Sequence, residues 1–129
     1  MSWNECEILA ARRAILEAAQ DMLAGRFSYI EGARKIIAAR FTSRIGEWDA
    51  DLLAFVGIDS ETDALPLGDR RTYWQAAALD ALQPEITRME AWARQFGEPH
   101  CRNLVARFSS GEIENQHAAS LKVIYEARI

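Results

Sequence analysis

A helix-start signal that occurs three times does most to limit the folds open to this chain. In this capping box, a serine and a glutamate three residues later each bind the backbone amide of the other, which fixes the first turn of a helix. Apolar residues at helical spacing follow the first two boxes, and Gly25 and Gly46 stand where left-handed residues commonly end helices. The sequence therefore predicts two antiparallel helices before residue 47. The three boxes are Ser2 with Glu5, Ser28 with Glu31, and Ser109 with Glu112.

Helical spacing continues in the middle of the chain, with several expected interruptions. Prolines and glycines decide where these fall, because proline lacks an amide proton and glycine favours helix ends. A short helix should precede Gly57, a longer one should follow the acidic loop, and a further short one should carry Cys101. Gly32, inside the second helix, indicates a close approach of two helices. The expected starts and stops are Asp49 or Asp51, Gly57, Thr72, Pro84, Gly97 and Pro99.

The C-terminal segment, residues 109–129, fits two patterns. Ile113, His117, Leu121 and Ile124 have helical spacing, whereas Leu121, Val123, Tyr125, Ala127 and Ile129 recur at every second position as in a strand. A single strand without a partner is not stable, so the segment favours a helix. We predict one all-α domain over residues 1–129. It would be a bundle of five to six helices, with a constrained acidic loop between the second or third helix and the fourth.

Acidic residues are concentrated in one part of the chain. The formal net charge is −4, and all 15 lysines and arginines lie outside residues 45–69, which contain seven of the 19 acids. This distribution disfavours a nucleic-acid-binding protein, which usually carries a basic surface. No apolar run is long enough to span a membrane, and no secretory signal is visible. Two cysteines, Cys6 and Cys101, are too few for a disulfide framework, so we expect both to be reduced and buried in a cytoplasmic protein.

The acidic loop resembles a calcium site only in its first residues. Asp59, Glu61 and Asp63 alternate like the first ligands of an EF-hand, but Ala64 and Arg70 stand where that loop requires glycine and glutamate. We therefore expect no metal. Ser60 and Asp63 can instead form a local cap, and the neighbouring arginines can neutralise the acids. The expected structural lock consists of Asp59, Ser60, Asp63, Arg34, Arg70 and Arg71.

Other catalytic chemistries lack the residues that they need. The soft metal ligands Cys6, His100, Cys101 and His117 have no zinc-site spacing. No glycine-rich phosphate loop and no nucleophile elbow occurs. We therefore expect a protein that is not an enzyme and that needs no cofactor.

Protein recognition is the function class that fits the remaining features. Trp74 and Trp92 lie on helical stripes and are expected in the core, whereas Trp3 and Trp48 lie at helix starts beside acids and could anchor an interface. An acidic surface would attract a basic protein partner. The expected contact residues are Glu47, Trp48, Asp49, Asp51, Glu61 and Asp69.

Three stretches resemble a known family. They read LAGRFSYIEGARKI, FVGIDSETDALPLGDRRTYW and EAWARQFGEPHCRNLVARF, and they lie between residues 8 and 108. Together they resemble a family of short bacterial proteins known only as a domain of unknown function; residues 109–129 lie outside the resemblance. It implies a compact helical bacterial protein and no enzyme activity. By analogy with small acidic helical proteins of bacteria, we expect an immunity-type inhibitor that covers the active site of a toxin.

Two alternatives stay open from the sequence. One is a small metal-dependent hydrolase that uses Asp59, Glu61 and Asp63. The other is a structural homo-oligomer, such as a homodimer, that associates through the apolar C-terminal segment.

Overall fold

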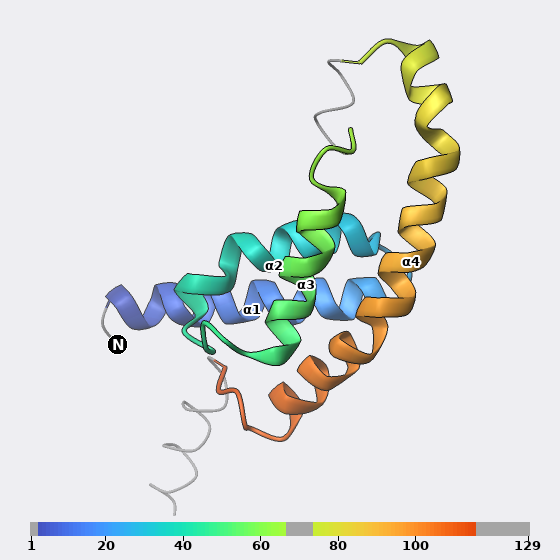
Figure 1. The fold of residues 1–129 in the computed structure, drawn as a ribbon. Coiled ribbons are helices and arrows are strands. Elements are labelled where there is room, and N and C mark those ends of the chain that lie inside the picture. Colours follow the sequence, from blue (N-terminus) through green and yellow to red (C-terminus); the bar gives the residue numbers. More distant parts are fainter. Residues whose placement is uncertain (1–2, 67–73, 116–129) are drawn as a thin grey trace, which may run out of the picture.

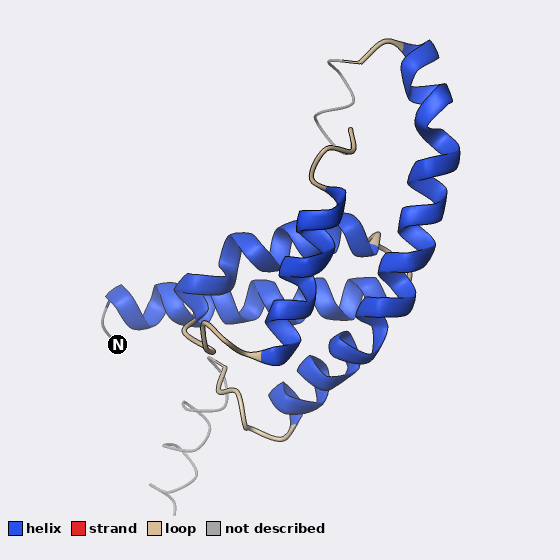
Figure 2. Cartoon of the chain, in the orientation of Figure 1, coloured by secondary structure: helices blue, strands red, loops and turns tan. Residues whose placement is uncertain are grey.

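Four helices make up the regular structure in the computed structural model, which describes residues 3–66 and 74–115. They are α1 (Trp3–Leu23), α2 (Tyr29–Ser43), α3 (Ala50–Thr62) and α4 (Ala76–Ser109). Within these two ranges the chain contains no strand (Figure 2). The expected all-α class is therefore confirmed. The C-terminal segment lies mostly outside the described residues, so its expected helix stays a prediction.

Figure 1 shows α1 and α2 side by side, with α3 crossing them and α4 running past one end. The turn between α1 and α2 is short because Gly25 adopts a left-handed φ of 77° and Ser28 caps α2 by accepting a hydrogen bond from the amide of Glu31. The core lies where α3 and α4 cover the α1–α2 pair. Its fully buried side chains include Ile15, Ile30, Ile36, Leu52, Phe55, Ile58 and Leu104.

Residues 3–66 and 74–115 contain four helices, whereas five to six were expected for the whole chain. Two expected helix ends do not occur, and only the one in α4 lowers the number of helices. Gly57 lies inside α3, which continues to Thr62, so residues 58–62, expected in the acidic loop, are helical. A glycine costs only about 1 kcal/mol inside a helix, and the burial of Phe55 and Ile58 on the same helix outweighs that cost.

The second missing end lies in α4, which includes both Pro84 and Pro99. Both prolines are exposed, so their rings face solvent, and the helix bends instead of stopping. Figure 1 shows this change of direction between the first and last parts of α4. Gly97 is also interior to α4. A methyl group there would lie 3.0 Å from Ile58 Cδ1 and 3.1 Å from Tyr29 Cδ2, so glycine allows α4 to approach α2 and α3.

Several aromatic residues expected in the core are at the surface instead. Phe41 continues the apolar stripe of α2, yet it is 67% exposed because the C-terminal turn of α2 extends past the core. Trp74 precedes α4 and is 42% exposed, whereas Trp92 is partly buried against the core and stacks on Phe96, with ring centroids 5.6 Å apart. The side chain of Trp3 lies outside the description.

The two cysteines have opposite environments, whereas both were expected to be buried. Cys6 is exposed on α1, and Cys101 is fully buried on α4 with its Sγ 4.0 Å from Met22 Sδ. Burial raises the pKa of the Cys101 thiol to about 12, with a smaller contribution from Glu98.

We therefore expect a thiol reagent such as Ellman's reagent to titrate one cysteine rapidly in the folded protein. Cys6→Ser should remove that fast reaction, and Cys101 should react only after denaturant is added, because the thiolate is the reactive form. Two fast equivalents at neutral pH would contradict the buried position of Cys101.

Candidate functional site

A dense polar network ties the start of α3 to the end of α4. Asp49 is the N-cap of α3: its side chain accepts hydrogen bonds from the amides of Asp51 and Leu52. The same carboxylate accepts two hydrogen bonds from Arg107, at 3.1 Å from Nη1 and 2.7 Å from Nη2. Burial alone would raise the pKa of Asp49, but the bonds from Arg107 and Leu52 outweigh it and lower the pKa below its usual value.

Asp51 completes this network from the first turn of α3. It is only 7% exposed, and its carboxylate binds Arg107 Nη1 at 2.9 Å, His100 Nδ1 at 2.9 Å and Asn103 Nδ2 at 3.1 Å. Arg107 also pairs with Glu112. Hydrogen bonds to Asp49 raise the pKa of Arg107 further above its usual value, although burial opposes the shift.

The carboxylates of Asp49 and Asp51 are therefore occupied within the chain. A partner could use them only by displacing Arg107, which would leave buried charge uncompensated. The two exposed acids of the expected contact surface are separated by α3, which is about 18 Å long: Glu47 precedes the helix and Glu61 lies in its last turn. Asp69 lies outside the described residues. The structure therefore does not gather the predicted acids into one surface.

The structure brings together part of the expected lock. Arg34 Nε lies 3.8 Å from Asp59 Oδ1, and Arg34 Nη2 donates to the carbonyls of Thr62 at 2.9 Å and Leu65 at 3.3 Å. Arg34 thereby ties α2 to the C-terminal end of α3 and the turn that follows. Arg70 and Arg71 lie outside the described residues.

The expected cap from Ser60 to Asp63 does not form, because Ser60 lies inside the last turns of α3 and not at a helix start. Helical geometry also separates the proposed metal ligands: residues two apart on a helix point about 200° apart, so Asp59 and Glu61 face different sides. Among the residues described, no group of three or more histidine, cysteine, aspartate or glutamate side chains could hold a metal ion.

A second cluster surrounds the turn between α2 and α3. We call Arg40, Phe41, Arg44, Glu47 and Trp48 the aromatic corner. Trp48 is 79% exposed, the largest exposed fraction among the exposed large apolar side chains of the described residues. Arg40 connects its two halves: its guanidinium carbon lies 4.6 Å from the centroid of the Phe41 ring, and its Nη2 donates to the carbonyl of Glu47.

Arg44 occupies an unusual backbone position in this corner. It is the C-cap of α2, with a φ of 51° and a ψ of 30°, a left-handed conformation that glycine or asparagine adopts at much lower cost. Its side chain is exposed and makes no hydrogen bond, ion pair or ring contact with any other part of the chain that is described. Sequence reasoning did not find Arg44, Arg40 or Phe41, because the helix stripe placed Phe41 in the core and no motif marks a left-handed arginine.

Two shallow hollows meet at Arg44. One, of about 310 Å³, lies against the first turns of α1. The other, of about 370 Å³, lies toward the end of α4 and includes Arg12 and Arg107. The first hollow is lined by Asn4, Glu7, Ile8, Phe41, Thr42 and Arg44.

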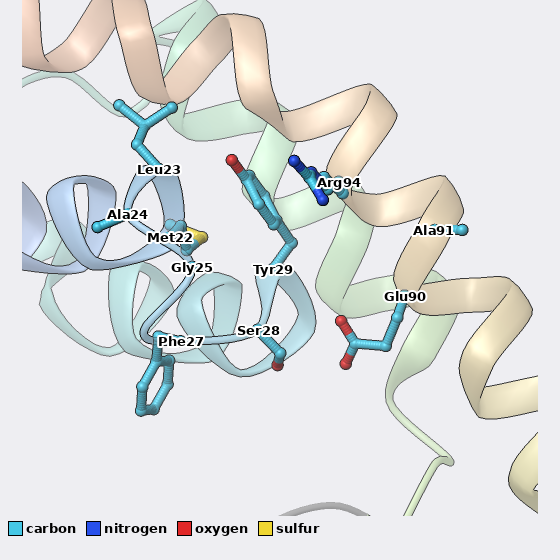
Figure 3. A pocket seen from close by; sticks show the side chains of 10 residues that line it. All are labelled: Met22, Leu23, Ala24, Gly25, Phe27, Ser28, Tyr29, Glu90, Ala91 and Arg94. Carbon is cyan, nitrogen blue, oxygen red and sulfur yellow. The ribbon is translucent and has the colours of Figure 1, made fainter.

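A third hollow, of about 420 Å³, lies between the α1–α2 turn and α4 (Figure 3). Its polar groups already serve the fold. Glu90, on α4, lies close to Ser28 and Ile30, and burial raises its pKa above the usual value although its interactions with these two residues oppose the shift. Tyr29 is 5% exposed, and burial raises its pKa to about 12. We interpret this hollow as the place where α4 packs against the start of α2.

No helix in the described ranges combines the length and apolar character needed to cross a membrane. No protein-family model, no curated protein and no solved structure matches this chain. The resemblance to a family of bacterial helical proteins therefore stays a prediction.

Proposed function

We propose that this chain is a non-catalytic protein-binding module that docks through the aromatic corner. The observation that carries the proposal is the presence of two highly exposed aromatic side chains, Phe41 at 67% and Trp48 at 79%, in one corner. Arg40 lies over the Phe41 ring and donates to the carbonyl of Glu47, the residue before Trp48. Tryptophan, phenylalanine and arginine are enriched in protein interfaces, and tryptophan and arginine dominate binding energy there.

The surrounding structure supports this use of the corner. Asp49 and Arg107 fix the start of α3 directly after Trp48, so the tryptophan projects from a constrained turn. A rigid aromatic anchor loses little conformational entropy when it is covered by a partner. Covering both rings would also remove apolar surface from water, which favours association.

Within this class, an immunity-type inhibitor remains our specific proposal. The corner would then cover the active site of a bacterial toxin, and the purified chain would abolish the activity of the toxin at a stoichiometric ratio. The metal-dependent hydrolase receives no support from the divergent positions of Asp59 and Glu61.

The proposal predicts that Phe41→Ala with Trp48→Ala releases the partner without unfolding the chain. Each truncation of an interface anchor typically costs about 2 kcal/mol or more, or roughly 30-fold in Kd. The immobilised wild type should retain one stoichiometric protein from a lysate of the organism of origin, and the double variant should not.

Trp74→Ala is the matched control, because Trp74 is also exposed but precedes α4, whose start lies at the opposite end of the molecule in Figure 1. It should retain the partner. Equal retention by the wild type and the double variant, with both folded by circular dichroism, would reject the aromatic corner as the binding surface.

A further inference from the structure

We infer that the aromatic corner recognises a protein segment that presents a carboxylate to Arg44 while its apolar side chains cover Phe41 and Trp48. This inference rests on the proposed function and names the chemistry of the partner. It differs from the basic partner expected from the sequence, because that expectation counted Asp49 and Asp51 as free charges, and both are bound by Arg107.

Three charged side chains in or beside the corner remain available to a partner. Glu7 and Glu47 are exposed, as is Arg44, and none of the three side chains has a partner within the described part of the chain. Arg40 already donates to a backbone carbonyl and lies against a ring. The corner is therefore close to neutral overall, so total charge does not select the partner. The guanidinium of Arg44, beside Phe41, is therefore the group that would select the partner.

The left-handed backbone of Arg44 carries a conformational cost. A left-handed conformation is unfavourable for any residue with a Cβ atom, and glycine at a helix end avoids that penalty. A positive side chain near the C-terminus of α2 recovers part of the cost through the helix dipole. No contact made by the side chain recovers the rest within the described residues. A strained residue without internal contacts is typical of a residue retained for binding.

Arg44 also lies next to an exposed ring of the corner. Arg44 and Phe41 line the same hollow together with Glu7, so a bound segment that enters it meets an apolar ring, a guanidinium and one carboxylate of the chain. Guanidinium groups bind carboxylates with two parallel hydrogen bonds, which fixes orientation as well as affinity. On the other side of Arg44, the Arg12 guanidinium donates to the carbonyls of Ser43 and Glu114, and it pairs with no carboxylate among the described residues, so it adds positive potential.

Selection from a library of random 16-residue peptides displayed on phage tests this chemistry without the natural partner. Peptides are selected on the wild type and counter-selected on the Phe41→Ala, Trp48→Ala double variant. We expect the recovered peptides to contain more aspartate and glutamate than the input library, about twofold or more, together with apolar residues. Selection on Arg44→Glu should reverse the enrichment toward lysine and arginine, whereas Arg88→Glu, an exposed arginine on α4, should not.

The outcomes separate the two proposals. If no peptide depends on Phe41 and Trp48, both the proposed function and this inference fail. If peptides depend on the two rings but have the acid content of the input library, only the carboxylate at Arg44 is rejected. Concentration-dependent dimerisation that the double variant abolishes would show that a second copy occupies the corner, and would also overturn the inference.

Arg44→Gly provides a readout that a structural role would not produce. Because glycine relieves the left-handed strain, the midpoint of thermal unfolding should stay equal or rise, while the Kd of the selected acidic peptides should increase by about fivefold or more. A lower unfolding midpoint with unchanged peptide affinity would mean that Arg44 serves the fold.

Discussion

Arg107→Met should destabilise the protein by about 3 kcal/mol, because it leaves Asp49 and Asp51 without their main counter-charge. Both carboxylates are nearly buried, with side-chain exposures of 11% and 10%, and Arg107 is 22% exposed. Methionine keeps much of the side-chain volume, so the lost free energy of unfolding measures the effect of the unpaired charges and not that of a cavity. Urea unfolding followed by circular dichroism measures the change.

Arg102→Met is the matched control, because Arg102 lies on the same helix, is 68% exposed and pairs only with Glu98. Its effect should stay below about 1 kcal/mol, as is usual for exposed ion pairs. Adding Asp49→Asn and Asp51→Asn to Arg107→Met should restore part of the lost stability. Equal losses for the two arginine variants would contradict the network.

Gly97→Val should destabilise the protein by about 3 kcal/mol. The first added carbon already lies 3.0–3.3 Å from Ile58, Tyr29 and Phe55, so the branched side chain must force α4 away from α2 and α3. Thermal and urea unfolding should both show the loss.

Gly57→Val is the matched control on α3, where an added Cβ meets nothing within 4 Å. It should change stability by less than about 0.5 kcal/mol, because valine is no worse than glycine inside a helix. If Gly97→Val were as stable as Gly57→Val, α4 would not pack through Gly97.

Local signals in the sequence predicted the first half of the fold well. Ser28 with Glu31 marks the start of α2, and Asp49 marks the start of α3, because capping depends on residues that are adjacent along the chain. The helix ends predicted at Gly57 and Gly97 were wrong, because both glycines lie inside helices. Whether a glycine ends a helix or lies within it depends on what packs against it, and that partner is distant in sequence.

The site was less predictable than the fold. Arg107 lies 58 residues from Asp49, so nothing local showed that it would bind both acids of the predicted contact surface. The exposure of Phe41 depends on where α3 begins to cross α2, and the left-handed backbone of Arg44 has no sequence signature. Trp48 was identified because its place before a helix cap is visible in the sequence.

Hydrogen–deuterium exchange on the chain with its captured partner tests the central claim most directly. The account predicts slower exchange on binding for the backbone amides of residues 40–48, with no change at Glu61. Protection around Glu61 instead, with residues 40–48 unaffected, would show that the partner binds elsewhere and would contradict the account.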